Sequence, residues 1–108
     1  MKKTKDSEKD IEKALRVKIK ALGGHALKFS SCIESGYPDR IVLLPGGVLS
    51  FVELKSEGEK PRKLQTIRHA ELRDLGFHVE VIDTIDGLNR FIDDCKTIVA
   101  FEHVKSKL

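Results

Sequence analysis

The chain has 108 residues, 40% of them hydrophobic and 34% charged, with a formal net charge of +3 at pH 7. This length and composition predict one folded domain over residues 1–108 and exclude a disordered polypeptide. No apolar run approaches the about 20 residues needed to cross a bilayer, which excludes a membrane role. Basic residues cluster at the N-terminus, at 60–63 and at 105–107, a distribution that favours a polyanionic partner.

The cysteine pattern favours a reducing compartment. Cys32 and Cys95 lie far apart in the sequence and form no CxxC pair. No charged and then apolar leader precedes the first predicted helix. We therefore expect a reduced, intracellular protein that works in the cytoplasm.

The first predicted elements are a helix and a strand. Ser7 has the character of an N-cap, and apolar residues then recur at helical spacing over Glu8–Leu22 until Gly23 stops the run. The segment His25–Ile33 alternates weakly between apolar and polar residues, which predicts a first strand.

The middle of the chain predicts a β-hairpin. Arg40–Leu44 and Val48–Lys55 are both rich in β-branched and other apolar residues. The turn Pro45-Gly46-Gly47 between them is short enough to require antiparallel pairing.

A helix and a further strand follow the hairpin. Pro61 lies near the expected start of the helix, and Gly76 follows its end. We predict that an apolar stripe on this helix faces the core, formed by Leu64, Ile67, Leu72 and Leu75. The run Phe77–Asp83 predicts an interior strand, and a strand, helix and strand in this order usually form a parallel pair.

A last helix is expected after Thr84, its predicted N-cap. Its core positions recur at helical spacing: Leu88, Phe91, Ile92 and Cys95. The segment 97–108 receives no assignment. The resulting αβββαβα order predicts an α/β protein in which helices flank a mixed β-sheet.

Three charged residues fall where the predicted hairpin ends. Side chains alternate along a strand, so Glu53 and Lys55 share one face, and antiparallel pairing brings Asp39 beside Glu53. Two neighbouring carboxylates raise each other's pKa unless a cation lies between them. Oxygen ligands of this kind suit Mg²⁺ or Mn²⁺, which could support hydrolysis of a phosphodiester with Lys55 neutralising charge.

The same three residues also allow an interpretation without catalysis. Asp39 could serve as a turn residue after Pro38, and Glu53 could form a solvated ion pair with Lys55 on an edge strand. The spacing of the charged residues alone does not distinguish the two interpretations.

A longer pattern resembles a known family. The segments GYPD, RIVLLPGG, FVELK and KLQTIRHAELRDLGFHVEVID resemble the virus-type replication-repair nuclease (VRR-NUC) family of the PD-(D/E)xK nuclease superfamily, and the likeness covers about Glu8 to Ile92. The resemblance implies a restriction-endonuclease-like fold. It also implies that Asp39, Glu53 and Lys55 are the motif residues and that the backbone carbonyl of Leu54 joins the metal ligands.

The resemblance implies further site residues on two helices. The family places an acidic residue on the first helix, and Glu12 fits that position, with Glu8 one turn earlier as the competing candidate. Gln65 matches a glutamine that the family places near the metal, the attacking water or the phosphate. His69, one turn after Gln65, is considered as a phosphate contact, and Tyr37 as a stacking surface for a sugar or base.

Several basic residues near the predicted site are candidates for contacts with backbone phosphates. They are Arg40, Lys60, Arg62, Lys63 and Arg68. Contacts of this kind position DNA without reading its sequence.

The resulting expectation is a Mg²⁺- or Mn²⁺-dependent DNA endonuclease. The resemblance implies action on branched or flapped DNA, such as a four-way (Holliday) junction in DNA repair, by a homodimer that is phage-encoded and acts in a bacterial host. Two functional alternatives stay open. The chain could be a non-catalytic, structure-specific DNA-binding module, or a small RNA-directed or toxin-like nuclease.

Overall fold

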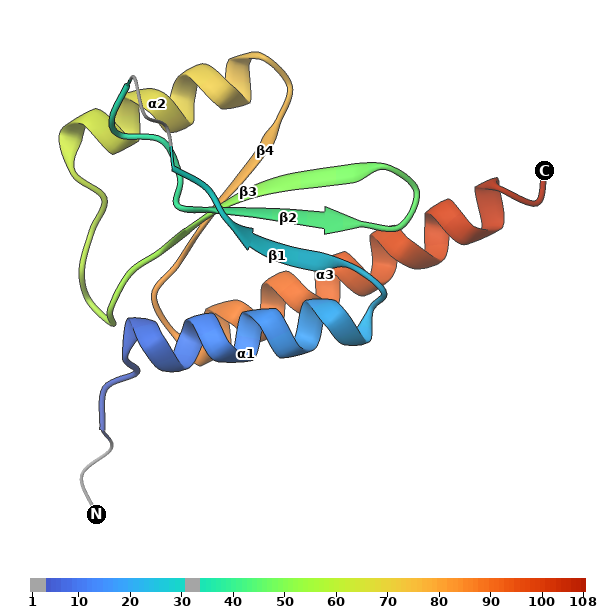
Figure 1. The fold of residues 1–108 in the computed structure, drawn as a ribbon, viewed down its shortest axis with the longest axis horizontal. Helices are drawn as coiled ribbons and strands as arrows, with labels where there is room; N and C mark the ends of the chain where they lie inside the picture. Colours follow the sequence, from blue (N-terminus) through green and yellow to red (C-terminus); the bar gives the residue numbers. More distant parts are fainter. Residues whose placement is uncertain (1–3, 31–33) are drawn as a thin grey trace.

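The computed structural model describes residues 4–30 and 34–108. Within this part of the chain, helices and strands follow the predicted αβββαβα order (Figure 1). The elements are α1 (Glu8–Ala21), β1 (His25–Lys28), β2 (Arg40–Leu44), β3 (Val48–Leu54), α2 (Lys63–Asp74), β4 (His78–Ile82) and α3 (Ile85–Lys105).

The strands form one mixed sheet in the order β1-β2-β3-β4. β2 pairs antiparallel with both β1 and β3, and its first residue, Arg40, lies opposite Val52 near the end of β3. β4 pairs parallel with β3, with Glu53 opposite Val81, because α2 carries the chain back to the starting end of the sheet. The predicted hairpin and the predicted parallel pair are therefore both confirmed.

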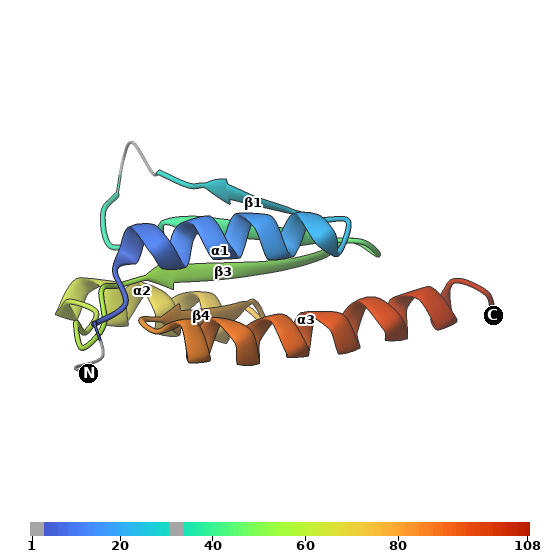
Figure 2. The ribbon, with the colours of Figure 1, turned by 90° about the horizontal axis from the view of Figure 1, so that it is seen from below.

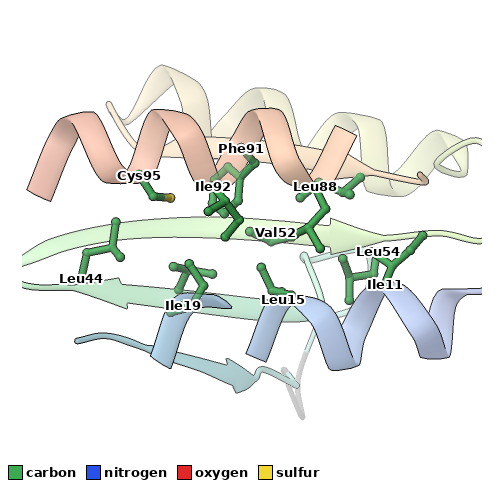
Figure 3. Close-up of a cluster of buried hydrophobic side chains, with 12 residues drawn as sticks. Ile11, Leu15, Ile19, Leu44, Val52, Leu54, Leu88, Phe91, Ile92 and Cys95 are labelled. Carbon is green, nitrogen blue, oxygen red and sulfur yellow. The ribbon is translucent and has the colours of Figure 1, made fainter. Parts of the chain in front are cut away.

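The helices form a layer on each face of the sheet. Figures 1 and 2 show α1 and α3 side by side on one face and α2 on the other. The main core fills the space between the sheet and the α1–α3 layer (Figure 3). Its buried side chains are Ile11, Leu15, Ile19, Val42, Leu44, Val52, Leu54, Ile82, Leu88, Phe91, Ile92 and Cys95.

Local capping interactions fix where the helices begin and end. The Ser7 hydroxyl accepts the Asp10 backbone N–H at 3.1 Å, and the Thr84 hydroxyl accepts the Gly87 N–H at 2.9 Å. α2 ends where Gly76 adopts a φ of +96°, which a residue with a Cβ rarely adopts. The expected caps and the expected stop at Gly76 are confirmed.

The predicted apolar stripe on α2 is wrong except at Leu72, which is buried. Leu64 and Ile67 are 41% and 45% exposed, and Leu75 lies beyond the helix and is largely exposed. The buried face of α2 carries two polar residues and one apolar residue: Gln65, His69 and Leu72. The physical reason is that α2 covers the charged end of the sheet, where His69 packs against the carboxyl group of Glu53.

Two predicted boundaries also change. The described part of the first strand ends at Lys28, and residues 31–33 of the predicted strand lie outside the described residues. The previously unassigned segment 97–108 continues α3 as far as Lys105, and this last part of the helix runs past the β2–β3 turn (Figures 1 and 2). No helix within the described residues is long and apolar enough to cross a membrane.

Candidate active site at the end of the hairpin

Asp39 is fixed by hydrogen bonds from three neighbours. Its backbone carbonyl accepts the Phe29 N–H and the Arg40 Nη1–H, each at 2.9 Å, and its carboxylate Oδ1 accepts the Leu54 N–H at 3.2 Å. The last bond ties the Asp39 side chain to the peptide that follows Glu53. The structure therefore brings Asp39 and Glu53 together at the end of the hairpin, as the strand register predicts.

Glu53 is a carboxylic acid enclosed in the protein. Only 3% of the residue is exposed, and its Oε1 atom has no hydrogen-bond partner among the described residues. Burial, followed by the negative charge of Asp39, raises the pKa of Glu53 to about 7. Such a group is only partly ionised at neutral pH in the metal-free protein, and a bound cation would favour its ionised form.

Lys55 lies next to this pair. Its backbone N–H donates to the Ile82 carbonyl at 3.0 Å, which continues the β3–β4 pairing by one residue. The positive charge of Lys55 lowers the pKa of Glu53, which shows that the ammonium group acts on this carboxylate. Two acidic groups and the Lys55 ammonium group therefore meet at the same end of the sheet.

The first helix carries two candidate carboxylates, Glu8 and Glu12, which have different surroundings. The charge of Glu8 raises the pKa of Glu53, so Glu8 lies within electrostatic reach of the hairpin carboxylates. Glu12 instead accepts a hydrogen bond from Arg16 Nε at 2.7 Å, an i,i+4 ion pair along the helix surface. The choice between Glu8 and Glu12 as the acidic residue of the site stays a prediction, and the electrostatic effect of Glu8 on Glu53 favours Glu8.

Asp6 holds the start of α1 at this end of the sheet. Its N–H donates to Glu57 Oε1 at 3.0 Å, and its carbonyl accepts the Glu57 N–H at 3.1 Å. Its carboxylate Oδ2 accepts the Ile85 N–H at 2.8 Å, at the first turn of α3. One residue thus ties together the segment before Glu8, the β3–α2 loop and α3.

Gln65 belongs to the buried face of α2. Its Oε1 accepts the Arg62 N–H at 2.8 Å, an interaction that also caps the helix. This bond occupies the carbonyl oxygen and leaves the amide NH₂ as the donor end of the side chain. Gln65 and Arg62 help to line a cavity of about 250 Å³ together with Ser35, Gly36 and Leu64.

Gly36 allows α2 to approach the GYPD segment closely. It has a φ of +91°, and a Cβ built on it would lie 2.7 Å from Leu64 Cγ. A larger residue would therefore push α2 away from the segment that leads into Asp39.

Two residues differ from their predicted roles. His69 places Nε2 3.5 Å from Glu53 Oε1, so the structure gives it a carboxylate neighbour where the sequence suggested a phosphate. Arg40 was considered as a phosphate contact, but it is buried and directs Nη1 to Asp39. The available sequence signal for His69 was its position one helical turn after Gln65, on the same face of α2.

The Tyr37 ring is also engaged within the protein. Its hydroxyl donates to Glu34 Oε2 at 3.2 Å, and the Arg68 guanidinium lies over the ring, 5.2 Å from its centroid. Arg68 also pairs with Glu71 at 3.2 Å. Tyr37 and Arg68 thus brace the segment before Asp39 against α2.

The donor set fits a hard divalent cation that keeps much of its own hydration. No three His, Cys, Asp or Glu side chains in residues 4–30 and 34–108 converge as a complete metal-binding group. Mg²⁺, however, is commonly held by one or two carboxylates together with waters and substrate oxygens. The neighbouring carboxyl groups of Asp39 and Glu53 meet that requirement.

The fold and this arrangement together define a nuclease of the PD-(D/E)xK class. A solved structure titled "VRR_NUC domain" superposes with a TM-score of 0.76 at 35% sequence identity, and the match covers 82% of this chain and 96% of that one. A phage protein, "Putative nuclease p44" of Acyrthosiphon pisum secondary endosymbiont phage 1, is 47% identical over 79 residues, which are 73% of this chain and 85% of that protein. No family model matches the chain.

These two relatives show that the chain belongs to the VRR-NUC family of nucleases. The family resemblance in the sequence is therefore confirmed, as is the restriction-endonuclease-like mixed sheet flanked by helices.

Proposed function

We propose that this protein is a metal-dependent endonuclease that hydrolyses phosphodiester bonds in DNA. The observation that carries the proposal is the enclosed carboxyl group of Glu53 beside Asp39, with a pKa raised to about 7. Two acidic groups in one site repel each other, and a protein that needed only stability would gain by replacing one of them. Membership of a nuclease family supports the same conclusion.

The proposed ligands of the cation are the side chains of Asp39 and Glu53 and the backbone carbonyl of Leu54. Glu8 completes the set in place of Glu12, directly or through water, because its charge acts on Glu53. An all-oxygen set of this kind favours Mg²⁺ or Mn²⁺. A bound divalent cation would neutralise charge on the phosphodiester and favour ionisation of a water molecule.

The surrounding side chains then bind and orient the substrate. The Lys55 ammonium group stabilises negative charge that develops on the scissile phosphate or orients the attacking water. The NH₂ group of Gln65 donates to a water or a phosphate oxygen at the same end of the sheet. Lys60, Arg62 and Lys63, in and after the β3–α2 loop, contact phosphates on either side of the cleavage position.

We further propose that the substrate is branched DNA and that the active species is a homodimer. A two-fold dimer presents two active sites to opposing strands, as resolution of a four-way junction requires. The surface that supports a dimer is the part of the sheet opposite α1 and α3 that α2 leaves open, with Leu27 48% exposed, Leu43 36% and Phe77 42%. The phage relative supports a phage-encoded enzyme that acts inside a bacterial cell.

Cleavage assays on labelled substrates test the activity. Duplex, flap, four-way junction and RNA substrates are incubated with the protein and Mg²⁺, Mn²⁺ or EDTA. We expect cleavage of branched DNA with either ion and none with EDTA. Cleavage of RNA alone would favour the RNA-directed alternative, and junction binding without any cleavage would favour the non-catalytic module.

Substitutions at the hairpin end test the assigned residues. Glu53→Gln and Lys55→Ala are each expected to lower the cleavage rate at least about 100-fold, because each removes a charge that the transition state needs. Glu59→Gln removes an exposed carboxylate in the neighbouring loop and should leave the rate unchanged. Cleavage at the wild-type rate by either of the first two variants would contradict the assignment.

A further inference from the structure

His69 lies directly behind the carboxyl group of Glu53. It occupies the buried face of α2, and its side chain is only 3% exposed, while that of Glu53 is 4% exposed. The two side chains come from different layers, because α2 covers the sheet face on which Glu53 lies. Their contact therefore depends on the docking of α2 against the sheet.

The two facing atoms have complementary chemistry and no other partner. His69 Nε2 and Glu53 Oε1 are 3.5 Å apart, and both are fully enclosed without a hydrogen bond among the described residues. Buried polar atoms nearly always form hydrogen bonds. A small movement of either side chain would bring these two atoms within hydrogen-bonding distance. Hydrogen bonds in active sites are often long until the site is loaded.

We propose that His69 is a positioning residue that holds Glu53 in its metal-binding orientation, an inference that rests on the function proposed above. The imidazole Nε2–H donates to Oε1, which is the enclosed oxygen of the carboxylate. Oε2 is then turned towards the cation that Glu53 shares with Asp39. This hydrogen bond restrains the rotation of the Glu53 carboxylate while the cation is bound.

The electrostatic surroundings agree with a neutral imidazole in this role. Burial, followed by the charges of Arg73 and Lys55, lowers the pKa of His69. A neutral imidazole carries one N–H, and placing it on Nε2 makes that atom a donor to the carboxylate. His69 therefore adds a hydrogen bond to the site without adding a second cation beside Lys55.

Metal affinity, measured by titration calorimetry on the protein without DNA, tests this role. His69→Leu keeps a similar volume but lacks the donor, and we expect the Kd for Mn²⁺ to rise about tenfold, the lower end of the range for partners that orient metal ligands. His69→Gln places an amide NH₂ near the position of Nε2 and should stay within about threefold of wild type. His69→Asn, whose amide stops short of Oε1, should weaken binding as the leucine variant does.

Controls separate positioning from packing. Leu72→Ala, on the same buried face of α2, should lower the melting temperature while Mn²⁺ affinity stays at the wild-type value. In the Mg²⁺-loaded wild type, ¹⁵N spectra of the imidazole should show the proton on Nε2. A proton on Nδ1 in that state would overturn the inference.

The outcomes also distinguish this inference from the proposed function. Wild-type Mn²⁺ affinity in His69→Leu, with binding lost in Glu53→Gln, would overturn the positioning role alone. Absence of Mn²⁺ binding by the wild-type protein would overturn both proposals. Weak binding in His69→Leu and His69→Asn with rescue by His69→Gln would support the role.

Discussion

At the scale of single residues, Glu53 is placed where an apolar side chain would stabilise the fold more. It lies on β3 between two apolar residues that belong to the core, and its burial opposes ionisation. A buried carboxyl group whose pKa is raised above its unfolded value makes the metal-free fold less stable as pH rises. Glu53 therefore links the stability of the metal-free protein to pH.

The pKa of Glu53 predicts the direction and the range of this effect. The pKa of Glu53 rises from an ordinary value of 4.5 to about 7 on folding. Its protonated form therefore contributes fully to the free energy of unfolding below pH 4.5, and this contribution is lost as pH rises through 7. We expect this group to lower the free energy of unfolding by about 2–3 kcal/mol between pH 4.5 and 8. Urea unfolding in EDTA across that range measures the change.

Glu53→Gln provides the comparison for this prediction, since it keeps the shape of the side chain but does not titrate. The wild type minus variant difference in unfolding free energy should fall as pH rises. Parallel curves for the two proteins would show that Glu53 does not carry the effect. Adding Mn²⁺ at pH 8 should stabilise the wild type and leave Glu53→Gln nearly unchanged.

The two acidic residues on α1 allow a matched comparison at the same scale. We expect Glu8→Gln to lower Mn²⁺ affinity and cleavage rate by about tenfold, because its charge acts on Glu53. Glu12→Gln breaks only the exposed ion pair with Arg16 and should change either quantity less than twofold. Titration calorimetry and cleavage assays on both variants measure the difference, and the reverse order would restore Glu12 as the site residue.

At the scale of secondary-structure elements, α2 shows how a short helix serves a polar site. Its buried face carries Gln65 and His69 with only Leu72 as an apolar anchor. Its other apolar residues are largely exposed, so α2 is held to the sheet by few buried apolar contacts and by polar ones. Gly36 supports this docking because it lets the helix approach closely.

The start of α1 depends on Asp6, which connects three segments around the site. Asp6→Ala removes the acceptor for the Ile85 N–H and should lower the free energy of unfolding by about 1 kcal/mol, the usual cost of losing a helix cap. Asp6→Asn retains a side-chain oxygen as acceptor and should lower the stability less. Urea unfolding at pH 7 in EDTA compares the variants, and equal stability of Asp6→Ala and wild type would show that the contact contributes nothing.

At the scale of the whole molecule, the two faces of the sheet are covered unequally. α1 and α3 close one face over the main core, whereas α2 covers only part of the other (Figures 1 and 2). A row of edge-to-face rings crosses this open face from Phe29 through Phe51 to Phe77, with centroids 6.1 and 5.5 Å apart. An apolar sheet face of this kind is a natural surface for a second copy of the chain.

Light scattering coupled to gel filtration tests the proposed dimer and its surface. We expect the mass of two chains for wild type and of one chain for Leu43→Lys, which places a charge on the open face. Phe101→Lys, on the exposed end of α3, is the matched control and should remain a dimer. A monomeric wild type would contradict the dimer, and dissociation by Phe101→Lys alone would move the interface to α3.

The sequence by itself determined the element order and the meeting of Asp39 with Glu53. Both follow from local rules, since strand alternation and a short turn decide which side chains share a face and which residues lie opposite each other. The spacing of apolar residues along a helix was misleading for α2, because Leu64 and Ile67 indicated a buried stripe that the fold leaves exposed.

Only the tertiary structure shows the charge of Glu8 acting on Glu53 and the contact of His69 with Glu53. Both depend on how a helix is rotated and placed against a sheet, and residues one turn apart on the same helix face are equivalent in sequence until that placement is known. α2 turns the polar residues Gln65 and His69 toward the sheet and leaves Leu64 and Ile67 exposed. The spacing of apolar residues in the sequence does not predict where buried polar side chains of a helix make contact.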